Sequence, residues 1–277
     1  MKLLFPSEIA AMDREEAERE IRARVQTVSI SDDIVLTRVL GCPKMYLSKS
    51  DHGFAHHVML DGHWELWLTL FMARKVTPGM KAIDVGANFG YYSLLLGLAV
   101  GATGKVAAVE PNPRIAEILA RSINLNGLHW VKLFEKAVGA IDEQILTMFQ
   151  PKNEPKNTAV VPDNWPSDEG AVFRVPSTTV DAIADELGGV DFIKIDAEGA
   201  EIAIVDGMKK TIEYYKPNIV LEFNAARYSD PEGFLSKFKG YKSPRAIDYH
   251  GDLIKISEKD IIETDYGQDK LVYFEKY

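Results

Sequence analysis

A glycine-containing turn forms the first candidate site. Residues 82–90 read AIDVGANFG, so a short apolar run ends at Val85 and two glycines follow at a spacing of four. Glycines at a strand-to-helix turn let backbone come close to a ligand at the carboxyl end of the strand. The spacing lacks the G-x-G-x-x-G of dinucleotide sites, which brings a helix N-terminus against pyrophosphate. We expect a nucleotide-like ligand without pyrophosphate, held by Asp84, Gly86, Ala87, Asn88 and Gly90; taken alone, these residues also fit a turn that only serves the fold.

The next predicted strand, KVAAVE, ends in an acid, Glu110. Pro111 and Asn112 come after it. A carboxylate at this place matches the two hydroxyls of a ribose in bidentate geometry. Taken alone, Glu110 also fits an ordinary acid that is stabilised by the dipole of the following helix. The third strand, WVKLFEKAV, ends near Ala137, where an adenine would lie between apolar side chains.

The two acids together favour S-adenosylmethionine (SAM) as the ligand. SAM has a ribose for Glu110 but no pyrophosphate, and its sulfonium and its ammonium are positively charged. A carboxylate at Asp84 suits this charge and would be unfavourable beside phosphates.

A second group of charged residues lies in KIDAEGAE, at the end of the predicted fourth strand. Lys194 and Asp196 share one face of that strand because side chains alternate. A methyl acceptor with a hydroxyl needs a base within reach, and Asp196 is the leading candidate, although an exposed aspartate titrates near 4 and is a weak base. Lys194 can pair with Asp196 or act as the base if its pKa is depressed. The alternatives are a structural ion pair and, for Glu198 and Glu201, acids that favour a helix N-terminus.

Further polar residues offer other chemistry. Asp196, Glu198 and Glu222 could together bind a hard cation through oxygen, but their spacing matches no metal signature, so we expect no metal. Four histidines crowd the segment before the glycine turn, together with Trp64 and Trp67, and a sugar pocket could use this mixture of rings. The histidines are nevertheless interpreted as scattered rather than as one site: His52, His56, His57 and His63.

These motifs resemble the FkbM family of methyltransferases. The resemblance covers roughly residues 80–225 and rests on IDVGANFGYYS, VEPNP, STTVDAIA, KIDAEGAE and NIVLEFN. It implies a class I methyltransferase fold, SAM as donor, S-adenosylhomocysteine as product and a hydroxyl acceptor on a sugar, a glycolipid or a secondary metabolite. It also implies that the residues of the glycine turn and Glu110 hold the donor, and that Lys194, Asp196 and Glu198 face the reaction.

Other functions are weighed against methyl transfer. A non-catalytic SAM-binding scaffold of the same fold is the alternative. A nicotinamide-dependent oxidoreductase disagrees with the glycine spacing. Nucleic-acid methylation disagrees with the net charge of −9 and with the absence of an N-P-P-Y motif after the fourth strand. We therefore expect no nucleic acid as a partner, and the resemblance to the FkbM family implies a small-molecule or glycan acceptor.

Alternating strands and helices must position these residues. Five apolar strands separated by helical patterns predict a mostly parallel α/β sheet with helices on both faces, and segments 252–256 and 270–274 add antiparallel strands to give seven. The polar, proline-rich segment 151–170 replaces a helix and is expected to cap one edge. It fits either a long functional loop or a plain surface excursion between two strands.

Residues 1–75 are predicted to form an N-terminal extension and residues 76–277 the Rossmann-like methyltransferase domain. The extension contains a charged helix over 8–26, a hairpin around Gly41 and a helix over 64–74.

The composition predicts a globular protein of the cytoplasm. No run approaches the roughly 20 apolar residues of a membrane span. The N-terminus turns acidic before a signal-peptide core can form, and Cys42 is the only cysteine, so an internal disulfide is impossible.

Overall fold

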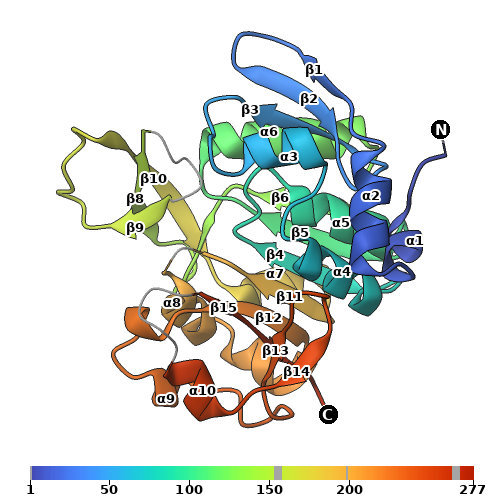
Figure 1. The fold of residues 1–277 in the computed structure, drawn as a ribbon. Coiled ribbons are helices and arrows are strands. Elements are labelled where there is room, and N and C mark those ends of the chain that lie inside the picture. Colours follow the sequence, from blue (N-terminus) through green and yellow to red (C-terminus); the bar gives the residue numbers. More distant parts are fainter. Residues whose placement is uncertain (1, 153–157, 198, 264–268) are drawn as a thin grey trace.

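A computed structural model describes residues 2–152, 158–197, 199–263 and 269–277. They form three sheets, and helices pack on both faces of the largest one (Figure 1). No helix in these ranges combines the length and the apolar character that crossing a membrane requires.

The largest sheet has eight strands in the order β14-β13-β15-β12-β11-β4-β5-β6. Their bounds are β4 (Lys81–Val85), β5 (Lys105–Val109), β6 (Val131–Phe134), β11 (Phe192–Ile195), β12 (Asn218–Phe223), β13 (Arg245–Ile247), β14 (Leu253–Lys255) and β15 (Lys270–Phe274). The strands from β6 to β12 are parallel, and β15 lies antiparallel between β12 and β13. The mostly parallel α/β sheet with antiparallel closure is confirmed. The predicted number of seven strands is wrong, because the sheet also contains the short strand β13.

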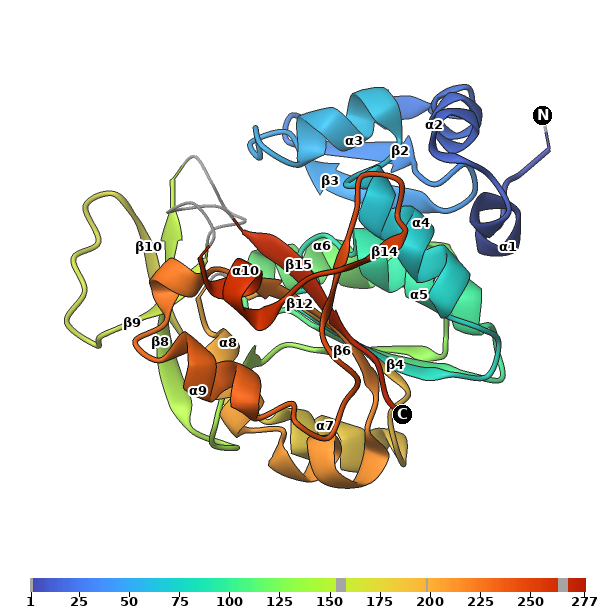
Figure 2. The same cartoon turned by 60° about the horizontal axis from the view of Figure 1, so that its bottom comes forward.

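Alternation of side chains along the strands creates one core on each face of the sheet. On β4, Ala82 belongs to the core beneath helices α5 (Tyr91–Val100) and α6 (Pro113–Leu125). Ile83 belongs to the opposite core, which helices α7 (Val180–Leu187) and α8 (Glu201–Asp206) cover. Figure 2 shows the sheet between these two layers. Asp84 shares its face with Ala82 and therefore lies under α5.

The carboxyl-terminal part adds shorter helical elements. After α8 come the π-helix η2 (Thr211–Tyr215), the 3₁₀-helix η3 (Ala225–Arg227) and the helices α9 (Pro231–Ser236) and α10 (Glu258–Ile262).

A second sheet projects beside the first and has the order β7-β10-β8-β9 (Figure 1). Its strands are β7 (Ala137–Val138), β8 (Ile145–Pro151), β9 (Ala159–Val161) and β10 (Gly170–Thr178). The predicted third strand is therefore too long: it ends at Phe134, and Ala137 begins a strand that pairs with β10 instead. The segment 151–170 is also more than a loop, because β9 pairs with β8. Residues 153–157 of that segment lie outside the described residues.

The N-terminal part comprises helices and a third sheet of order β1-β2-β3. Its elements are α1 (Pro6–Ala10), α2 (Arg14–Arg22), β1 (Thr27–Ser29), β2 (Ile34–Arg38), β3 (Lys44–Ser48), α3 (Ala55–Asp61) and α4 (Leu66–Lys75). The predicted hairpin is β2 and β3, and the predicted helix over 64–74 is α4. The single helix predicted over 8–26 is wrong, because Asp13 accepts a hydrogen bond from Glu16 N and starts a separate helix. The domain boundary at residue 75 stays a prediction.

Candidate active site

The glycine turn between β4 and α5 is held in place by contacts with neighbouring backbone segments. Gly86 and Ala87 donate backbone hydrogen bonds to the carbonyl of Val109 on β5. Gly86 has φ +75°, and a Cβ placed there would lie 1.8 Å from the carbonyl oxygen of Asp196. A side chain at position 86 would therefore displace the backbone that follows β11.

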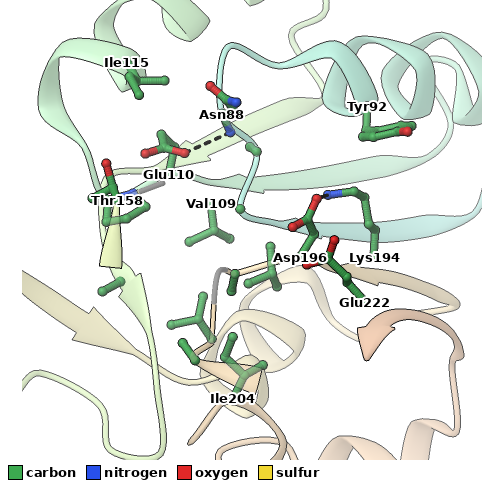
Figure 3. A pocket seen from close by; sticks show the side chains of 18 of the residues that line it. Asn88, Tyr92, Val109, Glu110, Ile115, Thr158, Lys194, Asp196, Ile204 and Glu222 are labelled. Carbon is green, nitrogen blue, oxygen red and sulfur yellow. Dashed lines mark hydrogen bonds and ion pairs between the residues drawn. The ribbon is translucent and has the colours of Figure 1, made fainter. Parts of the chain in front are cut away.

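Glu110 follows β5, and nearby backbone N–H groups hold its carboxylate. Its two carboxylate oxygens accept hydrogen bonds from Asn88 N at 2.9 Å and Asn112 N at 2.8 Å. Burial raises its pKa to about 7, against the opposing effect of these two hydrogen bonds. The carboxylate lies on the wall of a cavity, where Figure 3 shows it beside Asn88.

That cavity lies at the carboxyl edge of the parallel strands. Six of the residues predicted to bind the donor line it: Gly86, Ala87, Asn88, Glu110, Pro111 and Ala137. Apolar side chains of Val109, Ile115, Val138 and Met148 also line the cavity. The empty space of the cavity is about 1190 Å³, including the part that is open to solvent.

Three predicted donor residues lie away from the cavity wall. Asn112 caps α6 by accepting hydrogen bonds from Arg114 N and Ile115 N. Gly90 begins α5 at φ +97°, where an added Cβ would meet Leu119 at 2.2 Å. Both residues thus shape the turns that carry the site.

Asp84 is the third, and it is fully buried beneath α5. Its Oδ2 accepts a hydrogen bond from Ser93 Oγ at 2.6 Å, and its Oδ1 lies 3.7 Å from Lys194 Nζ. Burial raises its pKa, while Lys194 and Ser93 oppose the rise. The carboxylate therefore faces Lys194 and Ser93, and the structure does not bring it to the cavity as the sequence predicted.

Lys194 is the centre of a buried charged group. Its Nζ lies 3.2 Å from Asp196 Oδ2 and 4.9 Å from the ring centroid of Tyr92. Burial alone would lower its pKa, but the charges of Asp196 and Asp84 outweigh burial and raise the pKa above its ordinary range. The ammonium is thus retained, so the predicted ion pair is present and Lys194 is unsuited to act as a base.

Asp196 and Glu222 bring two carboxylates to the cavity from neighbouring strands. The Asp196 side chain is 33% exposed and lines the cavity, and its Oδ2 forms the ion pair with Lys194 Nζ (Figure 3). Glu222 on β12 also lines the cavity, and its Oε2 lies 3.7 Å from Arg227 Nη1.

KIDAEGAE contains two other acids, Glu198 and Glu201. Glu198 lies outside the described residues. Glu201 is buried and accepts hydrogen bonds from Ala197 N and Gly199 N at the start of α8, as its structural interpretation predicted. Within the described residues, no three or more His, Cys, Asp or Glu side chains are grouped as metal ligands.

Sequence reasoning considered Trp64 for a sugar pocket but missed the rest of the contribution of the N-terminal part. Phe54, Trp64 and Glu65 line the cavity, as does Tyr92 of α5. Tyr92 comes soon after the glycine turn, so its position is a usable signal. Around Glu65 the signal is the neighbouring pair His63 and Trp64, which indicates rings and not a carboxylate. The cavity lining among the described residues includes none of the four clustered histidines.

Comparisons with known proteins found methyltransferases among the similar sequences and structures. A protein of Sulfolobus acidocaldarius named "Probable cobalt-precorrin-6B C(15)-methyltransferase (decarboxylating)" is 24% identical over 140 residues, 49% of this chain and 73% of that protein. "Protein-L-isoaspartate O-methyltransferase 2" of Arabidopsis thaliana is 39% identical over 49 residues, 18% of this chain and 16% of that protein. The crystal structure of methyltransferase FkbM from Methylobacillus flagellatus KT aligns with a TM-score of 0.44 and 17% identity, over 76% of this chain and 53% of that one.

The family model of the methyltransferase FkbM domain matches residues 84–259. This span covers more than half of the chain and contains the glycine turn, Glu110 and the Lys194–Asp196 pair. The chain therefore belongs to the FkbM family of SAM-dependent methyltransferases.

Proposed function

We propose that the protein transfers a methyl group from SAM to a hydroxyl of a small-molecule or glycan acceptor, giving a methyl ether. The observation that carries this proposal is the carboxylate of Asp196 on the cavity wall, held by the buried ammonium of Lys194. A hydroxyl acceptor needs a group that takes its proton, and a positioned carboxylate supplies one.

The described residues of the cavity suit SAM. Glu110 presents a carboxylate for the ribose hydroxyls, and the apolar side chains of Val109, Ile115 and Val138 offer surfaces for the adenine. Bound there, SAM supplies a methyl carbon whose bond to sulfur breaks with its electron pair staying on sulfur, which leaves S-adenosylhomocysteine.

Asp196 and Lys194 divide the remaining work. Asp196 accepts the proton of the hydroxyl as the acceptor oxygen bonds to the methyl carbon, and it then releases the proton to solvent. Lys194 holds Asp196 in place and keeps its own proton, because the charges of Asp196 and Asp84 raise its pKa. Holding the two reactants in line supplies much of the rate.

Aromatic side chains support a ring-shaped acceptor. Phe54 and Trp64 line the cavity, and their rings pack edge to face with their centroids 5.1 Å apart. Aromatic faces bind the apolar side of a sugar or of another ring, while Glu222 on the same wall can accept hydrogen bonds from hydroxyls.

The test uses SAM labelled in its methyl group with a panel of hydroxylated acceptors, from monosaccharides and glycolipids to phenols. We expect a labelled product that survives mild alkali, which cleaves methyl esters, and that hot hydroiodic acid converts to methyl iodide, as it does methyl ethers. Failure of titration calorimetry to detect SAM or S-adenosylhomocysteine would overturn the proposal. A labelled product whose methyl is bound to carbon or nitrogen would overturn the hydroxyl acceptor.

A further inference from the structure

We infer that Gln150 is a positioning residue of the donor site, which holds the side chain of Asn112 and, through Asn112, the carboxylate of Glu110. This inference rests on the proposed use of the cavity for SAM. Gln150 belongs to β8 of the second sheet, so the inference gives that sheet a part in donor binding.

Strand β8 contributes to the cavity wall. Met148 of this strand and Val160 of β9 line the cavity. Figure 3 shows Thr158, which immediately precedes β9, on the same side of the cavity as Glu110. Because side chains alternate along a strand, Met148 and Gln150 share one face of β8. The face of β8 that forms cavity wall therefore also carries Gln150.

The side chain of Gln150 reaches the turn that carries Glu110. Its Oε1 accepts a hydrogen bond from Asn112 Nδ2 at 2.5 Å, across 38 positions of sequence. Asn112 is buried, and its Oδ1 accepts hydrogen bonds from Arg114 N and Ile115 N at the start of α6. The oxygen and the amide of Asn112 are thus both engaged, and the side chain is fixed from two sides.

Asn112 passes this restraint on to the carboxylate. Its backbone N–H donates to Glu110 Oε1 at 2.8 Å. This hydrogen bond favours the ionised form and lowers the pKa of Glu110 against the rise that burial causes. A displacement of Asn112 would therefore turn the carboxylate and raise its pKa further. Gln150 acts on the donor only through these two residues.

Gln150→Met tests the inference, because methionine has a similar length but only a weak acceptor. We expect the Kd for S-adenosylhomocysteine at pH 7, measured by titration calorimetry, to rise about 3- to 10-fold, the equivalent of one hydrogen bond. The midpoint of the pH dependence of this affinity should move upward by about half a pH unit, because Glu110 is less well held. Gln144→Met changes an exposed residue just before β8 and should alter neither quantity.

Asn112→Ser tests the same link from the other side. Serine is a good N-cap, and the backbone N–H that donates to Glu110 is retained, but the amide that reaches Gln150 is removed. This variant should reproduce the loss of affinity and the upward shift of the midpoint. The double variant should be no worse than either single variant, because both changes break one hydrogen bond. Additive losses would show that the two residues act separately and would overturn the inference.

Two further outcomes would overturn the inference while leaving the proposed function standing. One is unchanged affinity of Gln150→Met, and the other is a loss of affinity without a shift of the midpoint, since a residue that only supports the sheet leaves the titration of Glu110 unchanged. Thermal unfolding followed by circular dichroism checks each variant, and Asn112→Ser carries the test if Gln150→Met does not fold. If the wild-type protein binds neither SAM nor S-adenosylhomocysteine, the proposed function itself fails.

Discussion

The two ends of the cavity are built from acids in different ways. At the end near Ile115, Glu110 accepts hydrogen bonds from two backbone N–H groups, that of Asn112 two residues away in sequence and that of Asn88 in the glycine turn. At the opposite end, Lys194 is placed between Asp84 and Asp196, which come from two neighbouring strands. The first arrangement depends on local turns, and the second depends on the register of β4 and β11, in which Asp84 and Lys194 pair directly.

This difference separates the consequences of mutation. A change at Glu110 should act on donor binding and leave the strands in place. A change at Lys194 should act on the sheet itself, because the buried charges there balance one another.

Asp196→Asn should produce the largest effect. We expect kcat to fall by about 10²- to 10⁴-fold because the proton acceptor is removed, with the Kd for S-adenosylhomocysteine changed less than about threefold. Steady-state kinetics with labelled SAM and titration calorimetry measure the two quantities. Glu222→Gln is the matched variant on the neighbouring strand and should lose less activity. Normal turnover by Asp196→Asn, or a larger loss in Glu222→Gln, would place the base elsewhere.

Lys194→Met should lower the free energy of unfolding by about 3–5 kcal/mol, because it leaves the buried carboxylate of Asp84 without its cation. Urea denaturation followed by circular dichroism measures this change. Lys239→Met alters an exposed lysine and should stay within about 0.5 kcal/mol of wild type. Equal stability of the two variants would show that the Lys194 group contributes no net pairing energy.

Gly86→Ala should disturb both ends at once, since the added Cβ collides with the Asp196 carbonyl. Gly127→Ala is the matched control: its φ of +65° is similar, but an added Cβ meets nothing within 4 Å. We expect the control to cost about 1–2 kcal/mol from backbone strain alone and Gly86→Ala to cost more and to lose donor binding. Similar losses of stability and binding in the two variants would contradict the close approach.

The pH dependence of donor binding should give the smallest effect. The pKa of Glu110 is about 7, above its ordinary value of 4.5, so the group is largely protonated at pH 6 and ionised at pH 8. Ribose hydroxyls donate best to the carboxylate, so affinity for S-adenosylhomocysteine should rise up to about tenfold from pH 6 to pH 8. Calorimetry at both pH values measures this, and Glu110→Gln should abolish the dependence. A wild-type affinity independent of pH would contradict the assignment.

The raised pKa of Glu110 changes folding stability with pH in the opposite direction to donor affinity. Because the folded state binds the Glu110 proton more tightly than the unfolded state, this group contributes stability at low pH that is lost as the pH rises from about 4.5 to about 7. The difference in melting temperature between wild type and Glu110→Gln across this range measures that contribution.

Several features could be predicted from the sequence because they depend on short segments. The alternation of apolar strands and helices predicts the parallel sheet, and each acid after a strand must lie at its carboxyl edge. The glycine turn, Glu110 and the Lys194–Asp196 pair were identified in this way, and the family follows from the same residues.

Other features depend on which side chains share a face and which distant segments meet. Whether Asp84 faces the cavity or Lys194 depends on the pairing of β4 with β11 and on the helix above it, and neither can be derived from Asp84 and its neighbours in sequence. Only the packing of the N-terminal part against α5 brings Glu65 to Tyr92 across 27 positions of sequence. The residue types and their order along the chain thus determined the fold class and the kind of ligand. The tertiary structure decided which carboxylates lie on the cavity wall and which remain in the core, because burial and pairing of charge depend on contacts between segments far apart in the chain.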